Sequence, residues 1–386
     1  MIGATPVIVD ALRTPVGRAT KGSLASIRPD DLGALVVRAL VDRTGIHPFE
    51  IDELVCGCGY PWGEQGYNVG RGIALLAGLP SSVPAQTVTR MCASSLQAIR
   101  IASHMVEVGE GDTFVCCGVE SCSRAGRDFH LAQPNPALKT RPDGSDYYIP
   151  MLMTAENVAR RFDVPRHEMD AFAQRSHDRA LAAQRTGAFD REIVPVSDPS
   201  GHVIDRDDGP RPDSSLERLA SLPILTGDGG RITAGNSCLL SDGASAVLVT
   251  SEERARTLDV IPRARVVTSG VSGIDPEIMG VAPIEAVRRA LNRASMTMKD
   301  VDVFELNEAF AAQVLPTVRA LGVDPFDERL NPHGGAIALG HPFGMTGARI
   351  MTTLLGGLEA RDGSIGLEAM CVGGGQGQAM VIERLS

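Results

Sequence analysis

Residues 87–99 decide the fold, and they read Thr87-Val88-Thr89-Arg90-Met91-Cys92-Ala93-Ser94-Ser95-Leu96-Gln97-Ala98-Ile99. Residues 85–89 are short and β-branched, which predicts a strand. From Ser94 to Val108 apolar side chains recur near helical spacing, and Gly109 ends the run, which predicts a helix. Cys92 therefore lies on a turn that leads from a strand into a helix.

The position of Cys92 favours reactivity. Unpaired backbone N–H groups and the helix dipole at a helix start stabilise a thiolate. We therefore expect a cysteine pKa of about 8.5 to fall towards neutrality here, as a nucleophile requires. The alternative is that Cys92 is a small buried hydrophobic residue, the common fate of an intracellular cysteine. This stretch alone leaves both interpretations open.

The composition limits the class of protein. A chain of 386 residues exceeds one ordinary core, so we expect two or three packed units. No apolar run approaches the ~20 residues that span a bilayer, and the N-terminal residues show no secretory signal. We therefore expect a cytoplasmic enzyme. The formal charge of -10 argues against nucleic-acid or membrane partners, although local arginines still allow an anionic small molecule.

The cysteines predict no metal site. Cys56 and Cys58 flank one glycine, and no second pair stands at zinc-binding spacing. In the expected compartment the thiols should stay reduced, so we expect no disulfide framework.

The pattern of strands and helices divides the chain into three parts. Residues 1–118 alternate strand and helix and form an N-terminal half, completed by about 240–262. Residues 119–245 are rich in Arg, Asp, Pro and Gly and predict an inserted loop domain, with one long helical stretch interrupted at Pro165. Residues 263–386 resume the alternation and form a C-terminal half.

The two halves repeat one pattern. Residues 284–291 and 301–304 parallel residues 33–40 and 51–54, since each set gives a helix, a polar turn and a strand with an acidic residue. Chance similarity between two amphipathic helices is the alternative. Two related α/β halves, each with a helix-covered sheet, explain the pattern better.

Three further patches are too polar or too rich in glycine for a core. Asn307 and Glu308 follow a predicted strand at 303–306, either as a site or as a helix cap. His341 stands between glycine and proline, which holds an imidazole at a fixed angle, whereas His333 is expected to be structural. Residues 373–377 are rich in glycine and follow Cys371.

The glycine-rich stretch near the C-terminus fails the test for a dinucleotide site. A strand at 378–382 follows it and leaves no room for the required helix. The glycines are better explained as exposing backbone N–H groups to an oxyanion beside Cys371.

Two cysteines, a histidine and an asparagine on loops after strands make a specific combination. One cysteine can carry an acyl group while the other moves a proton on carbon. Making or breaking a carbon–carbon bond next to a thioester needs both functions, and it also needs stabilisation of two oxyanions.

These motifs resemble the thiolase family, the acetyl-CoA acyltransferases. The resemblance runs nearly end to end, and agreement of many motifs in one order is specific. The matching stretches are 92–95, 154–159, 233–236, 241–244, 307–310, 334–342 and 371–377.

The resemblance implies a role for each site residue. Cys92 resembles the nucleophile that forms the acyl-thioester. His341 resembles the base that activates it and, as a donor, one half of the enolate oxyanion hole. Asn307 would hold the water that forms the other half. Cys371 resembles the acid/base on the substrate α-carbon and on the CoA thiol. The N–H groups of Cys92 and Gly373 would bind the tetrahedral adduct.

The resemblance also implies a five-layered α/β/α/β/α fold of two duplicated halves, with the inserted loop domain holding CoA. Arg211 matches a family arginine near the CoA nucleotide. Cys238 stands where many members have a serine that contacts pantetheine. The positions that match the lining of the pantetheine tunnel are Met151, Ala234, Met279 and Phe310. Coenzyme A or acyl-CoA is then a substrate, and no permanently bound cofactor is expected.

Two departures bear on substrate and assembly. Short-chain biosynthetic members commonly carry a His-Met-Gly triplet where this chain has Pro150-Met151-Leu152, which weakens the case for acetoacetyl-CoA. The segment 120–154 is shorter than the tetramerising loop of those members, so a homodimer and a homotetramer both remain open.

The resemblance predicts an enzyme for 3-ketoacyl-CoA thiolysis or the reverse Claisen condensation, in fatty-acid or related acyl-CoA metabolism. The alternative is a thiolase-fold protein that binds acyl-CoA or lipids without turnover. Such a protein would usually lack one of the four reactive side chains, and all four are present. A decarboxylating ketosynthase would have a histidine where Cys371 stands.

Overall fold

The computed structural model describes residues 3–125 and 134–385. Within them, ten strands form one mixed sheet, in which the path β10-β11-β12-β9-β1-β8-β5-β3-β4 is extended by β2 beside β8. The path divides between β9 and β1 into two half-sheets of the same design.

The N-terminal half-sheet mixes parallel and antiparallel pairs. β3 pairs in parallel with β4 and β5, and β8 runs antiparallel to both β5 and β1. Predicted strands at 51–56 and 85–89 are confirmed with small shifts of their ends. The strands are β1 (Pro6–Arg13), β2 (Gly17–Arg18), β3 (Glu53–Cys58), β4 (Ala85–Val88), β5 (Thr113–Ser121) and β8 (Ser241–Ser251).

The C-terminal half-sheet repeats this order. β10 pairs in parallel with β11, and β12 runs antiparallel to both β11 and β9. A parallel bridge between Phe304 and Leu330 stands where β4 stands in the first half. The strands are β9 (Ala264–Gly273), β10 (Val303–Leu306), β11 (Ile365–Val372) and β12 (Gln376–Arg384).

The repeat extends to single hydrogen bonds. The Asp52 carboxylate accepts the N–H groups of Asp112 (2.7 Å) and Thr113 (2.9 Å). The Asp302 carboxylate accepts those of Ser364 (2.7 Å) and Ile365 (2.9 Å). These are the two acidic residues of the sequence repeat, so the duplication predicted from the sequence is confirmed.

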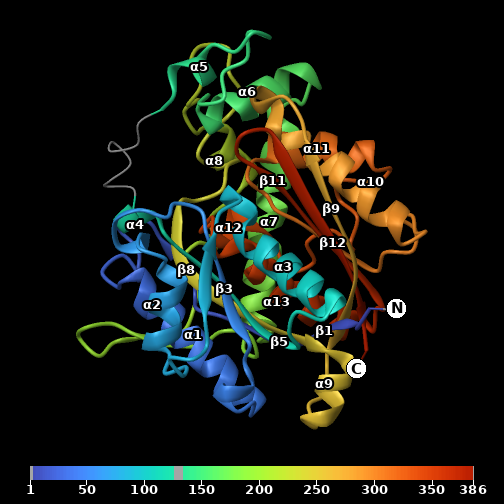
Figure 1. Cartoon of the computed structure of the whole chain (residues 1–386). Helices are drawn as coiled ribbons and strands as arrows, with labels where there is room; N and C mark the ends of the chain where they lie inside the picture. The colour runs from blue at the N-terminus through green and yellow to red at the C-terminus, as the bar shows by residue number, and fades with distance from the viewer. Residues whose placement is uncertain (1–2, 126–133, 386) are drawn as a thin grey trace.

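Helices complete five layers. α1 and α2 cover the N-terminal half-sheet, α3 and α13 pack together between the half-sheets, and α10 and α11 cover the C-terminal half-sheet (Figure 1). Three buried apolar clusters fill the spaces between these layers. The helices are α1 (Pro29–Thr44), α2 (Val69–Leu76), α3 (Ser94–Val108), α10 (Pro283–Arg293), α11 (Ala311–Ala320) and α13 (Thr346–Arg361).

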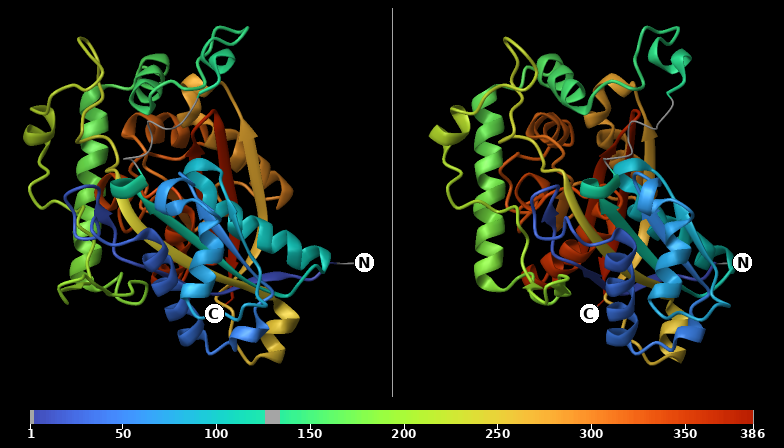
Figure 2. Two further views of the ribbon diagram at one scale, coloured as in Figure 1. Left: turned by 60° about the vertical axis from the view of Figure 1, so that its left-hand side comes forward. Right: turned by 90° about the vertical axis from the view of Figure 1, so that its left-hand side faces the viewer.

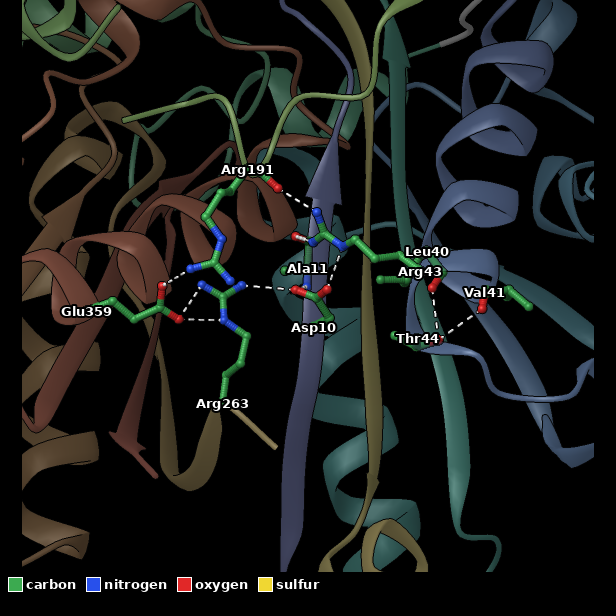
Figure 3. A network of polar contacts seen from close by, with 9 residues as sticks. All are labelled: Asp10, Ala11, Leu40, Val41, Arg43, Thr44, Arg191, Arg263 and Glu359. Atoms are coloured by element: carbon green, nitrogen blue, oxygen red, sulfur yellow. Dashed lines mark hydrogen bonds and ion pairs between the residues drawn. The ribbon is translucent and has the colours of Figure 1, made fainter. Parts of the chain in front are cut away.

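The half-sheets join at one edge. Only the register pairs Val7–Arg265 and Ile8–Ala264 link β1 to β9. A polar network in Figure 3 supports this junction, in which Arg263 contacts Asp10 of β1 at 3.0 Å and Glu359 of α13 at 2.7 Å. Arg43 of α1 binds the same Asp10 at 2.6 Å. The network therefore connects a strand and helix of the first half to the start of the second.

The inserted segment lies at one side of the molecule and over its top in the views of Figure 2. The predicted interruption at Pro165 is confirmed, because one helix ends at Arg161 and the next begins at Arg166. Its elements are α4 (Cys122–Ala125), α5 (Pro136–Lys139), α6 (Met151–Arg161), α7 (Arg166–Thr186), β6 (Val196–Ser197), β7 (Val203–Ile204) and α8 (Leu216–Ala220).

Short elements complete the description. They are α9 (Glu252–Thr257), α12 (Ala336–Leu339) and the 3-10 turns η1 (Pro48–Glu50), η2 (Gly63–Gln65), η3 (Met91–Ala93) and η5 (Pro276–Val281). In the part of the chain that the structure describes, every helix is too short or too polar to cross a membrane.

Candidate active site

Cys92 lies in η3, between β4 and α3, as the sequence predicts. The Ser94 hydroxyl accepts the Arg90 N–H (2.9 Å) and donates to the Met91 carbonyl (2.6 Å), which fixes the turn. A Cβ atom at Gly57 would come within 2.2 Å of the Ser95 nitrogen, so β3 packs directly beneath the helix start.

The expected activation of Cys92 at rest is wrong. Burial raises the pKa of Cys92 to about 12, although the backbone N–H groups of Gly373 and of Cys92 itself act to lower it. Desolvation of the charged sulfur outweighs the helix start because the side chain is almost enclosed. Cys92 is therefore a thiol at rest and needs a base that removes its proton.

His341 is buried, and its ring is held between Thr346 and Asn307. The Thr346 hydroxyl donates to the Pro342 carbonyl (2.7 Å), so it accepts from Nδ1–H of His341, 2.7 Å away. This assignment makes Nε2 an acceptor, and the Nδ2–H of Asn307 donates to it at 3.3 Å. Burial, with a smaller contribution from Arg349, lowers the pKa of His341 to about 3. The ring is thus neutral.

Asn307 presents its side chain to this ring and not to a helix. The first residue before α11 is Phe310, which makes no side-chain cap, so the helix-cap alternative for Asn307 is wrong. The Asn307 N–H donates to the Ala369 carbonyl (2.9 Å), which fixes the residue beside β11. Its Oδ1 is buried and has no partner among the described residues.

Cys371 lies on β11 close to Cys92. Burial raises the pKa of Cys371 well above its ordinary value, and the nearby Cys92 and Cys238 sulfurs raise it further. Its Sγ–H donates to Oε1 of Gln313 at 3.5 Å. Gly373 follows on the same segment, with its N–H directed at the Cys92 sulfur. The structure therefore brings together the two reactive cysteines and Gly373, while Asn307 and His341 meet beside the same strand.

Two of the residues expected to bind CoA share one groove. Arg211 and Ala234 line one groove, together with Leu239. The Leu239 carbonyl accepts the His341 N–H at 3.0 Å, which connects that groove to the site.

The other predicted CoA contacts lie on neighbouring segments. The Cys238 N–H donates to the Ala309 carbonyl (3.0 Å), and Ser237 bridges to Phe310. Met279 is buried in η5, against which α6 packs, and Met151 begins α6 with 37% of its surface exposed.

Three contacts escaped the sequence reasoning. Gln313 touches Cys371, Thr346 orients His341, and Glu120 accepts the N–H groups of Gly59 (2.8 Å) and Gly344 (2.9 Å). Burial raises the pKa of Glu120 to about 7. None of the three belongs to a motif with a recognisable spacing. Glu308, which was singled out with Asn307, binds Ser176 and Asn331 and is structural.

A duplicated five-layered α/β fold with these side chains defines an acyltransferase that works through thioesters. Family models agree, since the description "Thiolase, N-terminal domain" matches residues 6–253 and "Thiolase, C-terminal domain" matches residues 260–384. The chain belongs to the thiolase family.

Several relatives are similar over nearly the whole chain. A 3-ketoacyl-CoA thiolase of Bacillus subtilis is 43% identical, covering 98% of each chain. A beta-ketoadipyl-CoA thiolase of Acinetobacter baylyi is 45% identical, covering 98% of this chain and 99% of that one. The crystal structure of the Bacillus anthracis acetyl-CoA acetyltransferase superimposes with a TM-score of 0.91, at 35% identity and 100% coverage of both chains.

Proposed function

We propose that this thiolase transfers acyl groups between 3-ketoacyl-CoA and CoA through an acyl thioester on Cys92. The names of the relatives, 3-ketoacyl-CoA thiolase and beta-ketoadipyl-CoA thiolase, support this substrate class. The observation that carries the proposal is one buried site built from both halves, with Cys92 facing Gly373 and Cys371, and Asn307 facing His341.

The first half-reaction begins at the lone pair of His341. Nε2 takes the Cys92 proton, and the thiolate attacks the 3-keto carbon. The N–H groups of Cys92 and Gly373 stabilise the tetrahedral oxyanion. The C2–C3 bond then breaks, and the enolate of acetyl-CoA leaves beside protonated His341 and Asn307. Cys371 gives its proton to the enolate carbon, which leaves acyl-Cys92, acetyl-CoA and a Cys371 thiolate.

The second half-reaction restores the enzyme. The Cys371 thiolate takes the proton of an incoming CoA thiol, and the CoA sulfur attacks the acyl-Cys92 carbonyl. The C–S bond to Cys92 breaks, and Cys92 recovers its proton from His341. Every step is reversible, so the same residues serve condensation.

Labelling of Cys92 tests the proposal. Incubation with acetyl-CoA should add one acetyl group at Cys92, detected by peptide mass spectrometry. A Cys92→Ala variant controls for labelling elsewhere. Bound acyl-CoA with an unmodified Cys92 would instead support the non-catalytic binder.

Four finer points belong to this proposal. CoA thioesters are the only partners that the mechanism needs, with Arg211, Met151, Ala234, Cys238, Met279 and Phe310 along the CoA path. We propose that residues 1–118 form the N-terminal half, residues 119–245 the loop domain and residues 263–386 the C-terminal half.

A cytoplasmic homodimer or homotetramer is expected, and light scattering of the purified protein distinguishes the two assemblies. Thiolysis rates across substrates of rising chain length would define the acyl preference.

A further inference from the structure

Gln313 lies in the first turn of α11 and is only 2% exposed. It contacts Cys371, which is equally buried, through the Sγ–H to Oε1 hydrogen bond of 3.5 Å. Packing alone does not explain a buried amide beside the thiol that is proposed to move protons. A buried polar group needs hydrogen-bond partners and costs free energy without them.

Two neighbours hold the amide in place. Its Nε2 donates to Sδ of Met279 at 3.9 Å, which directs Oε1 towards Cys371. Gly280 provides the space, since a Cβ atom there would lie 2.1 Å from Cγ of Gln313. The next turn of the helix is different, because the Thr317 hydroxyl donates to the Gly280 carbonyl at 3.5 Å and not to Cys371.

An amide suits both states of a proton-transferring sulfur. A thiol donates one hydrogen bond and needs an acceptor, whereas a thiolate needs a donor. Gln313 presents Oε1 to the thiol as an acceptor. Rotation of the terminal amide group by half a turn about its bond to Cγ presents Nε2–H to the thiolate as a donor. The cost of that turn is small because the bond given up is to a thioether sulfur, a weak acceptor.

We propose that Gln313 is a positioning residue for Cys371, which orients the thiol for proton transfer to the substrate α-carbon and stabilises the thiolate that results. This inference rests on the acid/base role proposed for Cys371. A carboxylate could accept from the thiol and would repel the thiolate, and an alkyl side chain could do neither.

The test separates proton transfer from acyl transfer. Exchange of the acetyl-CoA methyl protons in D2O reports on proton transfer by Cys371 to carbon, and acetylation of Cys92 reports on acyl transfer, in which Cys371 serves only the CoA thiol. Gln313→Leu should slow the exchange about 10–100-fold, as expected for loss of part of the general acid–base catalysis, while Cys92 acetylation is slowed less than the exchange. Gln313→Glu should move the alkaline limb of the thiolysis pH profile to higher pH, because it opposes the thiolate.

Control variants keep the inference falsifiable. Thr317→Val, one turn away, should leave the exchange and the pH profile as in the unmodified enzyme. Gly280→Ala should reproduce the Gln313→Leu defect, because it displaces the amide without touching Cys371. Wild-type exchange and an unchanged pH profile in both Gln313 variants would overturn the inference. Wild-type exchange in Cys371→Ala would instead overturn the proposed function.

Discussion

The two halves of this thiolase share a scaffold and differ in what they place on it. Asp52 and Asp302 make the same pair of backbone bonds at the same point of each half. Counting along the paired strands from these residues, Gly57 corresponds to Asn307, and Val119 corresponds to Cys371. At these two positions the N-terminal half therefore has a small or an apolar residue, and the C-terminal half has Asn307 and Cys371 of the candidate site.

The inner faces of the half-sheets differ in the same way. Val55 and Cys116 are register partners that face α3 within an apolar cluster. Their counterparts Glu305 and Glu368 are also register partners. The residues on either side of each glutamate point into the outer apolar cluster, so the two glutamates point to the opposite, inner face of the sheet. Both are buried near Arg349 of α13, and several of their oxygens have no partner among the described residues. The two halves thus share a framework, while this pair of buried positions is apolar in one half and acidic in the other.

Cys371→Val should have the largest effect. It places in the C-terminal half the residue type that the N-terminal half has at the corresponding position, Val119. Without an acid/base on the α-carbon, thiolysis should fall by about 10²–10⁴-fold, as expected for loss of general acid–base catalysis. Acetylation of Cys92 should persist, as measured by peptide mass spectrometry. Val119→Ala is the matched control and should leave turnover unchanged. Near-normal thiolysis in Cys371→Val would refute the role of Cys371.

Asn307→Ala should have the next largest effect. Loss of one side of the enolate site should lower kcat about 10²–10³-fold, the range for removal of an oxyanion donor. Steady-state thiolysis kinetics measure it, and KM should change much less than kcat. If KM rises while kcat stays constant, Asn307 acts in substrate binding and not on the enolate.

Glu305→Gln tests the polar interior through pH. Burial raises the pKa of Glu305 to about 8, with Arg349 acting against the rise. A raised folded pKa means that stability is complete below the unfolded pKa of about 4.5 and declines as pH rises towards 8. The variant should therefore gain Tm relative to the unmodified protein between pH 5 and 8, as thermal unfolding at several pH values would show. A constant difference across that range would contradict a buried, titrating Glu305.

Asp52→Ala and Asp302→Ala should have the smallest effects, equal to each other. Each removes two backbone hydrogen bonds near the surface, so each should cost about 1–2 kcal/mol of unfolding free energy. Urea unfolding measures both. Clearly unequal losses of unfolding free energy would mean that the two aspartates have the same geometry and different contributions to stability.

The sequence predicted the parts that local rules determine. The helix 94–108 is found with the predicted ends, because Gly109 adopts a φ of 74° that terminates it. The paired acidic residues revealed the duplication because each follows a similar helix after a short polar turn, with one residue's difference in turn length. The thiolate expected at Cys92 failed because burial depends on the second half of the chain, which a local reading of residues 87–99 does not include. Gln313 and Thr346 escaped for the same reason, since only the fold brings them to Cys371 and His341.

The protonated resting state of Cys92 has a consequence for the life of the enzyme between turnovers. Peroxide and stray electrophiles attack sulfur anions far faster than thiols. In the proposed mechanism Cys92 becomes an anion only when His341 takes its proton, so the resting thiol is protected from such damage. The timing of proton transfer then contributes to the selectivity for thioesters. The Cys92 sulfur becomes a reactive anion only when the thioester substrate is present, so other electrophiles meet the thiol.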